Sequence, residues 1–400
     1  MKKKCLVCNS VFIDFLNLGK HPCADTFLPS RNKSLNLKKV TLKVGFCKCS
    51  HLTLIYPVDS YERYQKYDYS YTSDNSPVSR NHFRKIAKII YHNYKINKDS
   101  FIVEAGSNDG TFLKEIKTVT KCNVLGVEPS KNMCQIAKNN GIISQNSFFN
   151  ISSAKKIIKK FGKADVLYAA NVFNHVDDNF AFLEAARNIL KPDGALILEV
   201  PDLASLIKKV GFDTIYHEHR HYYSEKSISK ILYLKNFKIE KICKINYMSG
   251  SLRIFASKKT MKFKKVRYHS NIPLKSFREF KKKVLIIINE INKFVDLSLS
   301  QGKKIYGIGA ATKGNTLLNC CRLDYKKVKF ILDTSVYKIG KYTPGTGIKI
   351  VNEKSIKKIE KAIILPWNIT DHLVKKLFKN NEKSYISIPK ILKTIKCTKN

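Results

Sequence analysis

Acidic residues are scarce in this sequence. Its 400 residues include 31 Asp and Glu but 74 Lys and Arg, which gives a formal net charge of +43. Such a charge attracts anionic partners, for example nucleic acid or a phosphorylated small molecule. The lysines are spread over the whole chain, and the abundance of Lys, Ile and Asn is typical of an AT-rich coding sequence. We therefore expect no specific binding of nucleic acid.

Long apolar runs are also missing. The longest clean run, Val284 to Ile288, is far shorter than the ~20 residues that a membrane span needs. Met1 to Lys4 imitates the start of a signal peptide, but Cys8 to Ser10 and Asp14 interrupt the apolar stretch behind it. The sequence predicts no membrane span, no signal peptide and a cytoplasmic location.

Low-complexity linkers and internal repeats are absent too, so domain boundaries must come from changes of pattern. The length suits two or three domains. We predict an α/β protein with four parts: a small zinc-binding domain over 1–70, a central Rossmann-like cofactor domain over 71–260, a connecting helix within 261–300, and a Rossmann-like domain over 301–400. The sequence leaves the oligomeric state open.

The central part alternates helical and strand patterns. Apolar residues at helical spacing predict a helix from Pro77 to about Asn93, and a second helical pattern runs from Asp178 to Leu190. Short apolar runs between the helical patterns predict strands, namely Phe101 to Glu104, Asn123 to Val127, Asp165 to Ala170 and Ala195 to Val200. This rhythm predicts a parallel, doubly wound sheet. An apolar stripe over Phe277 to Val295 predicts the connecting helix.

Five of the eleven cysteines lie in the first 49 residues. Their odd total number argues against a disulfide framework. Cys5-x-x-Cys8 and Cys47-x-Cys49 instead predict a tetrahedral Zn²⁺ site, which four thiolates would make structural rather than catalytic. Because the second pair is one residue shorter than the usual spacing, other ligands stay possible. These alternative ligands are Cys23, His21 and His51.

A glycine turn follows the first predicted strand of the central part. It has the sequence Glu104-Ala-Gly106-Ser-Asn108-Asp109-Gly110, and the next strand delivers Glu128 to the same sheet edge. Glycine allows a nucleoside cofactor to approach closely, and a carboxylate can accept hydrogen bonds from ribose hydroxyls. The turn lacks the GxGxxG spacing of NAD sites, so S-adenosylmethionine (SAM) is favoured. The predicted cofactor residues are Glu104, Gly106, Asn108, Asp109, Gly110, Glu128 and Asn171.

Histidine and tyrosine gather in two segments. Asn171 to His175 follows a strand at the cofactor edge, and Phe212 to Ser224 holds three alternating histidines. Side chains that titrate near neutral pH are unusually dense here. We consider three hypotheses: a metal site made by His217, His219 and His221 on one strand face, a structural hydrogen-bond network, or proton-transfer catalysis in which Glu218 orients an imidazole.

A second glycine turn lies at Gly307 to Asn315, and Asp333 ends the next strand. It approaches the dinucleotide fingerprint, but Thr312 replaces the third glycine. NAD binding here, as in a nucleotide-sugar oxidoreductase, is one hypothesis. The second is that the turn and its lysine hold the phosphates of a nucleotide-linked substrate, and the third is a Rossmann-like shape without a dinucleotide.

Taken in order, these motifs resemble the SAM-dependent sugar C-methyltransferases of deoxysugar and surface-polysaccharide biosynthesis. The resemblance covers nearly the whole chain. Besides the motifs above, it rests on Leu18-Gly19-x-x-Pro22-x-Ala24-Asp25-x-Phe27, Tyr69-Ser70-Tyr71, Tyr216-x-Glu218-His219, Gly250-Ser251-Leu252-Arg253, Lys313-Gly314-Asn315-Thr316 and Trp367-Asn368.

The resemblance implies the roles of individual residues. His219 is implied as the base that removes the proton beside a ketone, with Tyr216, Glu218, His175 and Tyr71 as the other active-site residues. The substrate is implied to be a nucleotide-diphosphate keto-sugar, and its expected contacts are Lys313, Asn315 and Arg253. SAM and a structural Zn²⁺ are the implied cofactors. A zinc-containing RNA methyltransferase or RNA-binding protein is a further alternative.

Overall fold

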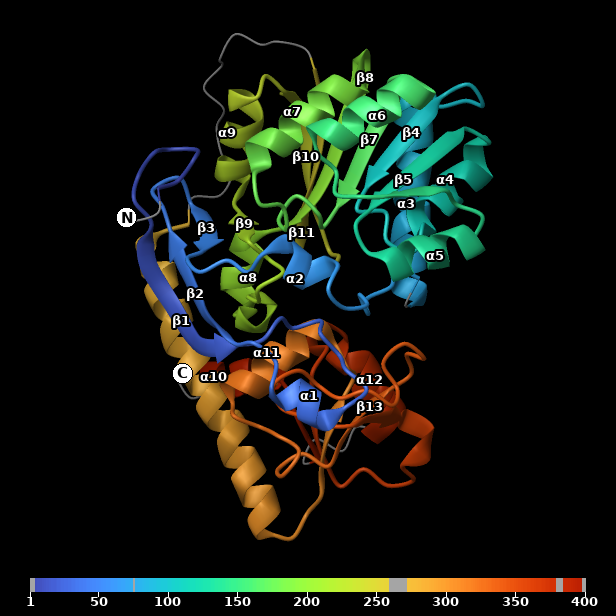
Figure 1. Cartoon of the computed structure of the whole chain (residues 1–400). Helices are drawn as coiled ribbons and strands as arrows, with labels where there is room; N and C mark the ends of the chain where they lie inside the picture. Colours follow the sequence, from blue (N-terminus) through green and yellow to red (C-terminus); the bar gives the residue numbers. More distant parts are fainter. Residues whose placement is uncertain (1–3, 75, 259–271, 379–383, 398–400) are drawn as a thin grey trace.

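The computed structural model describes residues 4–74, 76–258, 272–378 and 384–397. It contains three sheets. A small N-terminal sheet lies beside a large central sheet, and a third sheet forms the C-terminal body beneath both (Figure 1). The α/β class and the Rossmann-like central part are as predicted.

The N-terminal sheet is antiparallel. Its order is β1-β2-β3-β9, with β1 at Ile13–His21, β2 at Val40–Phe46, β3 at His51–Leu54 and β9 at His221–Tyr223. β9 comes from the histidine segment, more than 150 residues after β3. The predicted boundary at residue 70 therefore separates, along the chain, two segments that form one sheet in space.

The central sheet has seven strands. Its order is β10-β11-β8-β7-β4-β5-β6, and the bounds are Lys238–Ile245, Ser251–Ser257, Leu190–Pro201, Ala164–Ala170, Phe101–Ala105, Asn123–Glu128 and Ser144–Asn146. The five strands from β8 to β6 are parallel, as predicted, and β11 and β10 add an antiparallel edge. β8 begins at Leu190, earlier than predicted, because residues 190–194 already extend along the sheet.

Helices cover both faces of the central sheet. One face is covered by α3 (Pro77–Tyr94), α4 (Thr111–Thr120) and α5 (Lys131–Asn139), and the other by α6 (Ile151–Phe161), α7 (Asn179–Ile189) and α9 (Glu225–Leu234). Local sequence sets their ends. For example, the Ser76 hydroxyl caps α3 by accepting from the amide of Ser79, and Lys95 ends the helix at φ +50°.

The C-terminal sheet is parallel. Its order is β14-β13-β12-β15-β16, with bounds Ile350–Asn352, Phe330–Asp333, Ile305–Ile308, Lys361–Ile364 and Tyr385–Ile386. Its helices are α11 (Thr312–Cys320), α12 (Thr370–Phe378) and α13 (Ile388–Cys397). The second glycine turn joins β12 to α11, so it lies at the carboxyl edge of this sheet.

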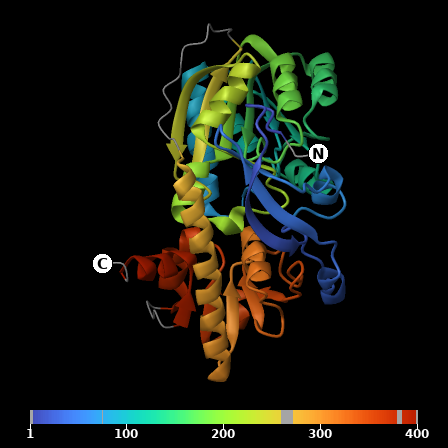
Figure 2. The same cartoon turned by 90° about the vertical axis from the view of Figure 1, so that its left-hand side faces the viewer.

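The long helix α10 (Leu274–Ser300) runs from the N-terminal sheet down along the C-terminal body (Figure 2). Its predicted apolar stripe is buried, and Phe277 packs against Phe15 of β1 and stacks on Phe46 of β2. One continuous hydrophobic core joins the N-terminal sheet, α10 and the C-terminal sheet. The helix is thus a shared packing surface and more than a connector.

Three short helices lie in segments that connect strands of these sheets. These are α1 (Arg31–Leu35), α2 (Ser60–Tyr64) and α8 (Leu203–Lys209). Among the described residues, none of the helices combines the length and the apolar character of a bilayer-crossing segment.

Candidate active site

The first glycine turn lies where β4, β5 and β7 end side by side. Gly106 has φ +66°, and a Cβ atom added there would stand 2.2 Å from Cγ2 of Val172. Both the backbone conformation and this close approach require glycine. The turn therefore packs against the start of the histidine segment, which brings the two predicted sites to one sheet edge.

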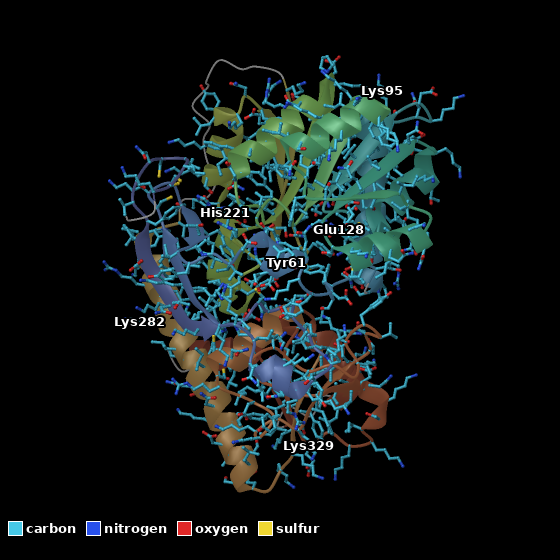
Figure 3. The ribbon with its side chains drawn as sticks, viewed as in Figure 1. Tyr61, Lys95, Glu128, His221, Lys282 and Lys329 are labelled. Atoms are coloured by element: carbon cyan, nitrogen blue, oxygen red, sulfur yellow. The ribbon has the colours of Figure 1, made fainter. Side chains whose placement is uncertain are left out.

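Glu128 ties this turn to the next strand. Its carboxylate accepts from the amide of Asn108 at 2.9 Å and from the amide of Ser130 at 2.8 Å. Burial raises its pKa, and these amides act against that shift. Each carboxylate oxygen has two lone pairs, so ribose hydroxyls can still be accepted. Figure 3 shows Glu128 at the end of the central sheet that faces the α2 segment, where Tyr61 is labelled.

Glu104 carries a buried oxygen, Oε2, without a hydrogen-bond partner among the described residues. Burial raises its pKa well above the ordinary value, and the nearby carboxylates of Asp109, Glu128 and Glu199 raise it further. Asn171, at φ +54°, likewise has a buried Oδ1 without a partner. Buried acidic groups of this kind fit a cationic ligand. SAM carries a sulfonium and an ammonium group, whereas NAD carries an anionic pyrophosphate.

Asn108 and Asp109 were predicted to bind the cofactor, but the structure gives their side chains other partners. Asn108 accepts from the amide of Ser73 and donates to the carbonyl of Tyr71, while Asp109 accepts from the amides of Asp74 and Thr111. These bonds hold residues 64–74, called the covering segment here, across the glycine turn. A polar side chain in a turn satisfies whichever backbone groups lie nearest, and sequence alone does not identify them.

His219 and Tyr216 form a hydrogen-bonded pair. Nδ1 of His219 lies 2.9 Å from the carbonyl oxygen of Thr214, and Nε2 lies 2.8 Å from the Tyr216 hydroxyl. A carbonyl only accepts hydrogen bonds, so Nδ1 carries the proton and Nε2 presents its lone pair to Tyr216. Burial lowers the pKa of His219 to about 4, which leaves the imidazole neutral at neutral pH. Both side chains stay half-buried, so they remain within reach of a ligand.

His175 lies against this pair. Its ring centroid is 4.7 Å from that of His219, and its Nδ1 is hydrogen-bonded to the hydroxyl of Tyr64. Burial lowers the pKa of His175 well below the ordinary value, and the neighbouring His219 and Arg63 act in the same direction. Sequence reasoning missed Tyr64 and Arg63, because nothing in α2 signals that it reaches the histidine segment.

The predicted role of Glu218 as the group that orients His219 is wrong. Its two carboxylate oxygens accept from the backbone amides of Asp25, at 2.8 Å, and Ala24, at 3.2 Å. The carbonyl of Thr214 orients His219 instead. Burial raises the pKa of Glu218 to about 7. Side chains of successive residues in a turn point in different directions, so adjacency in the sequence did not make Glu218 and His219 partners.

The hypothesis that the three alternating histidines bind a metal is also wrong. His217 is buried and directs Nε2 toward the carbonyls of His21, 3.1 Å away, and Val40, 3.2 Å away. Nδ1 of His221 lies 3.2 Å from Nε2 of His51, beside the N-terminal sheet (Figure 3). Only His221 lies in β9, and the preceding residues form a turn. The alternation along one strand face that the hypothesis needed is therefore missing.

Arg253 was expected to contact substrate but is engaged elsewhere. It lies opposite Glu199 in the β11–β8 pair, and its Nε is 2.7 Å from Oε1 of Glu199. His82 reaches the other oxygen at 2.8 Å and stacks on Tyr247. Burial raises the pKa of Glu199, but His82 and Arg253 outweigh it and lower the pKa overall. Arg253 thus neutralises the buried carboxylate of Glu199. The two residues lie 54 positions apart, so nothing in the local sequence around Arg253 predicted this pair.

Tyr71 lies near this second cluster rather than near His219. Its hydroxyl interacts with those of Tyr247 and Ser79, and burial raises its pKa well above the ordinary value. The predicted catalytic residues therefore divide into a Tyr216–His219–His175 group and a separate Tyr71 group. Both groups adjoin the glycine turn, since the carbonyl of Tyr71 accepts from Asn108.

The four predicted zinc ligands come together. The sulfur atoms of Cys5, Cys8, Cys47 and Cys49 lie within 4.8 Å of one another. Thiolates at about 2.3 Å from a tetrahedral Zn²⁺ have a similar spacing. The CxC pair reaches the cluster despite its short spacing, because Cys47 and Cys49 lie in the turn between β2 and β3. His51 follows this turn, with Nδ1 at 3.7 Å from the Cys5 sulfur.

Other residues of the chain pack against the second glycine turn and take up its hydrogen-bonding groups. A Cβ atom added to Gly309 would stand 2.7 Å from Pro366, and Asp333 accepts from the amides of Ala310 and Ser335. Asn315, predicted to contact substrate, is buried and donates to the carbonyl of Ala24 at 2.7 Å. Its predicted role is therefore corrected: it joins the C-terminal body to the N-terminal segment.

Lys313 remains available at this turn. It is half-buried, its Nζ lies 4.0 Å from the ring centroid of Trp367, and it donates to Asn368 at 2.7 Å. Burial lowers its pKa to about 8, although Asp213 acts in the opposite direction. The indole of Trp367 in turn donates to Asp213, which lies next to Thr214 in the segment from Phe212 to Ser224 that holds His219, called the catalytic segment below for its proposed role.

Known proteins resemble this chain in both of its larger bodies. Residues 79–242 match a methyltransferase domain, and residues 248–389 match a C-methyltransferase C-terminal domain. The C-methyltransferase NovU of Streptomyces niveus is 26% identical over 397 residues, which is 96% of this chain and 93% of that protein.

Solved structures also resemble part of this chain. A SAM-dependent methyltransferase from Clostridium acetobutylicum ATCC 824 is 14% identical with a TM-score of 0.37, covering 45% of this chain and 92% of that one. The cyclopropane synthase MmaA2 of Mycobacterium tuberculosis is 12% identical with a TM-score of 0.36, covering 46% and 86%.

The matched methyltransferase domain covers most of the central sheet and the first glycine turn. The chain is therefore a SAM-dependent methyltransferase. Within that class it is a C-methyltransferase, because the domain that follows the cofactor domain is the C-terminal domain of those enzymes and the relative of almost equal span is one of them. The alternative of an NAD-dependent oxidoreductase is thereby wrong.

Proposed function

We propose that this enzyme methylates the carbon next to the ketone of a nucleotide-linked keto-sugar, in deoxysugar or surface-polysaccharide biosynthesis. The observation that carries the proposal is the neutral His219–Tyr216 pair, half-buried beside His175 at the cofactor edge of the sheet. Methylation of such a carbon needs a base to remove its proton, and an imidazole whose Nε2 carries no proton is suited to that step once Tyr216 gives up its hydrogen bond.

The base is Nε2 of His219. The hydrogen bond from Nδ1 to the Thr214 carbonyl fixes the ring and stabilises the protonated imidazole once Nε2 has taken the proton. Protonated Nε2 can no longer accept from Tyr216. The Tyr216 hydroxyl is then free to donate to the enolate oxygen that forms as the carbon loses its proton. Proton removal and oxygen stabilisation are thereby linked through one hydrogen bond.

Tyr64 supports this arrangement from α2. Its hydroxyl holds Nδ1 of His175, and Arg63 donates to the carbonyl of His175 at 2.9 Å. These contacts fix the ring of His175 against His219, where it closes one side of the site. A rigid neighbour keeps the reacting carbon within reach of the base, because small displacements weaken proton transfer strongly.

The cofactor would be held by two residues whose buried oxygens have no partner among the described residues, Glu104 and Asn171, and by Glu128. Glu104 would bind the ammonium group of SAM, Asn171 would accept a further hydrogen bond, and Glu128 would hold the ribose. When bound, SAM supplies a methyl group that a carbanion-like carbon can attack. The covering segment, anchored by Asn108 and Asp109, limits the access of water to this edge.

The nucleotide end of the substrate is assigned to the C-terminal body. Lys313 stands at the start of α11, where the helix dipole favours a phosphate group. Its contact with Trp367 and the Trp367–Asp213 bond link this position to the catalytic segment. Binding energy from the phosphates can then hold the reacting carbon in place. A structural Zn²⁺ would be held apart from this site by Cys5, Cys8, Cys47 and Cys49.

Deuterium exchange tests the proposal. Wild-type enzyme with S-adenosylhomocysteine and a nucleotide-linked 4-keto-6-deoxysugar in D₂O should exchange the hydrogen beside the ketone without methyl transfer. His219→Asn should lower exchange and methylation by at least about a hundredfold, the range of a general base, while still binding both ligands.

His217→Asn and His221→Asn serve as matched controls and should keep most of the exchange activity, because neither side chain reaches the Tyr216–His219 pair. Loss of exchange in either control, with exchange retained in His219→Asn, would assign the base to another histidine. No exchange by the wild-type enzyme with any keto-sugar would remove the proposed substrate class.

A further inference from the structure

The carboxylate of Asp25 is buried and receives three hydrogen bonds from two other parts of the chain. Ser70 donates its amide to Oδ2 at 2.8 Å and its hydroxyl to Oδ1 at 2.9 Å. Thr312, in the C-terminal body, donates its hydroxyl to Oδ1 at 2.6 Å. Asp25 is 4% exposed. All three donors are neutral groups.

The backbone around Asp25 makes further links. The amides of Ala24 and Asp25 donate to the two oxygens of Glu218, and the carbonyl of Ala24 accepts from the side-chain amide of Asn315. Glu218 is 1% exposed and Asn315 is 2% exposed. We call this set, made by Ala24, Asp25, Ser70, Glu218, Thr312 and Asn315, the Asp25 junction.

Three members of the Asp25 junction are each next in sequence to a residue of the proposed site. Ser70 precedes Tyr71, Glu218 precedes His219, and Thr312 precedes Lys313. We infer that Asp25 is a positioning residue, which couples the substrate-holding turn of the C-terminal body to the catalytic segment and to the covering segment. The kinetic part of this inference rests on the proposed function, whereas the structural coupling does not.

The coupling follows from the hydrogen bonds that a buried carboxylate needs. A buried carboxylate stays ionised only where donors surround it, and removing one donor costs more than the bond itself contributes. The single hydroxyl proton of Thr312 is donated to Asp25, so it cannot also be donated to a phosphate. Loss of this hydroxyl would leave Oδ1 with one donor and would loosen Ser70 and residues 24–25 together, because all of them meet at one carboxylate.

Thr312→Val tests the coupling, because it removes the hydroxyl and keeps the side-chain volume. Thr312→Ser keeps the hydroxyl and should restore wild-type behaviour. Thr343→Val is the matched control: Thr343 is 1% exposed in the same body, and its hydroxyl bonds only to groups near it, Thr346 and Ile348. Asp25→Asn provides a second way to break the junction.

Amide hydrogen–deuterium exchange of the ligand-free proteins gives a readout that needs no substrate. Thr312→Val and Asp25→Asn should raise exchange in peptides covering residues 64–74 and 214–220, and Thr312→Ser should not. Thr343→Val should raise exchange only near residues 343–348. Equal exchange in Thr312→Val and Thr343→Val over residues 64–74 would overturn the inference.

Kinetics give the second readout. Thr312→Val should lower kcat for ketone-side deuterium exchange by about tenfold or more, with the Kd for S-adenosylhomocysteine unchanged and Thr312→Ser close to wild type. An increase of KM alone would make Thr312 a ligand of the substrate and would overturn the positioning role. If the wild-type enzyme acts on no keto-sugar, the proposed function fails, and amide exchange still decides the coupling.

Discussion

Glu104 is a single residue at which ligand binding and folding stability should change in opposite directions. Its pKa is raised by burial, so ionisation at neutral pH disfavours the folded state. Glu104→Gln removes that penalty, and the free energy of unfolding should stay equal or rise. The same change should weaken binding of S-adenosylhomocysteine by about tenfold or more, because a charged hydrogen-bond partner is lost.

Calorimetry and thermal unfolding of the same sample check both parts of this prediction. Glu115→Gln is the control, since Glu115 pairs with the exposed Arg84 on the outside of α4. A variant at Glu104 that binds the ligand as the wild-type protein does would place the cofactor's ammonium group elsewhere.

The acid limit of proton removal is a second prediction for single residues. His219 acts as a base only when deprotonated, and its pKa is held near 4. The loss of activity that comes from protonation of His219 should therefore occur as the pH falls through about 4, not near 6.5. Glu218, with a pKa of about 7, would add a separate limb that reports the Asp25 junction.

Glu218→Gln separates the two limbs. In this variant the rate of ketone-side deuterium exchange should be flat from pH 8 to pH 5.5. The measurement is a pH profile of exchange with saturating S-adenosylhomocysteine. A limb that stays near pH 6.5 in Glu218→Gln would mean that His219 titrates as an ordinary, exposed histidine.

Among the secondary-structure elements, β3 and β9 connect the cysteine cluster to the catalytic segment. β3 begins at His51, two residues after Cys49. It pairs with β9, which begins at His221, two residues after His219. His51 also contacts His221 across this pair. Metal at the cluster should therefore stabilise β9, because metal-binding energy contributes to the folding of the elements that carry the ligands.

Cys49→Ser should lower the zinc content well below the about one ion per chain expected for the wild-type protein. Amide exchange in β9 should rise at the same time. Cys243→Ser, in the edge strand β10 of the central sheet, is the control and should change neither, because Cys243 is not one of the four clustered cysteines. Zinc-free wild-type protein with unchanged exchange in β9 would show that the cluster does not support this strand.

At the scale of the whole molecule, the excess positive charge is dispersed. Lys95, Lys282 and Lys329 lie on separate parts of the outer surface, in or near three different bodies (Figure 3). Dispersed charge gives weak binding that depends on counterion release. Binding to mixed-sequence RNA or DNA should thus be weak, without sequence preference, and largely lost between about 50 and 200 mM salt.

Fluorescence anisotropy at several salt concentrations measures this binding. Tight binding that persists at about 0.3 M salt would favour an RNA methyltransferase over an enzyme of small substrates. Phosphorylated sugars lacking the nucleotide serve as competitors, and their failure to displace RNA would agree with a non-specific surface.

Local sequence determined the elements and the separate motifs of this protein. The apolar stripe over Phe277 to Val295 predicted α10, and the runs from Phe101 and Asn123 predicted β4 and β5, because helical and strand periodicity are properties of neighbouring residues. The spacing of Cys5 and Cys8 pointed to the sulfur cluster that the structure brings together.

Only the tertiary structure decided which groups became partners. Glu218 bonds the amides of residues 24 and 25, Arg253 pairs with Glu199, and Asn315 reaches Ala24 across 291 positions of the chain. A buried polar group takes whichever donor or acceptor packing brings near it, and that choice depends on strand pairing and domain contact. Sequence therefore located the chemistry at one sheet edge, while long-range packing placed Tyr64 and Asp25 where they support it.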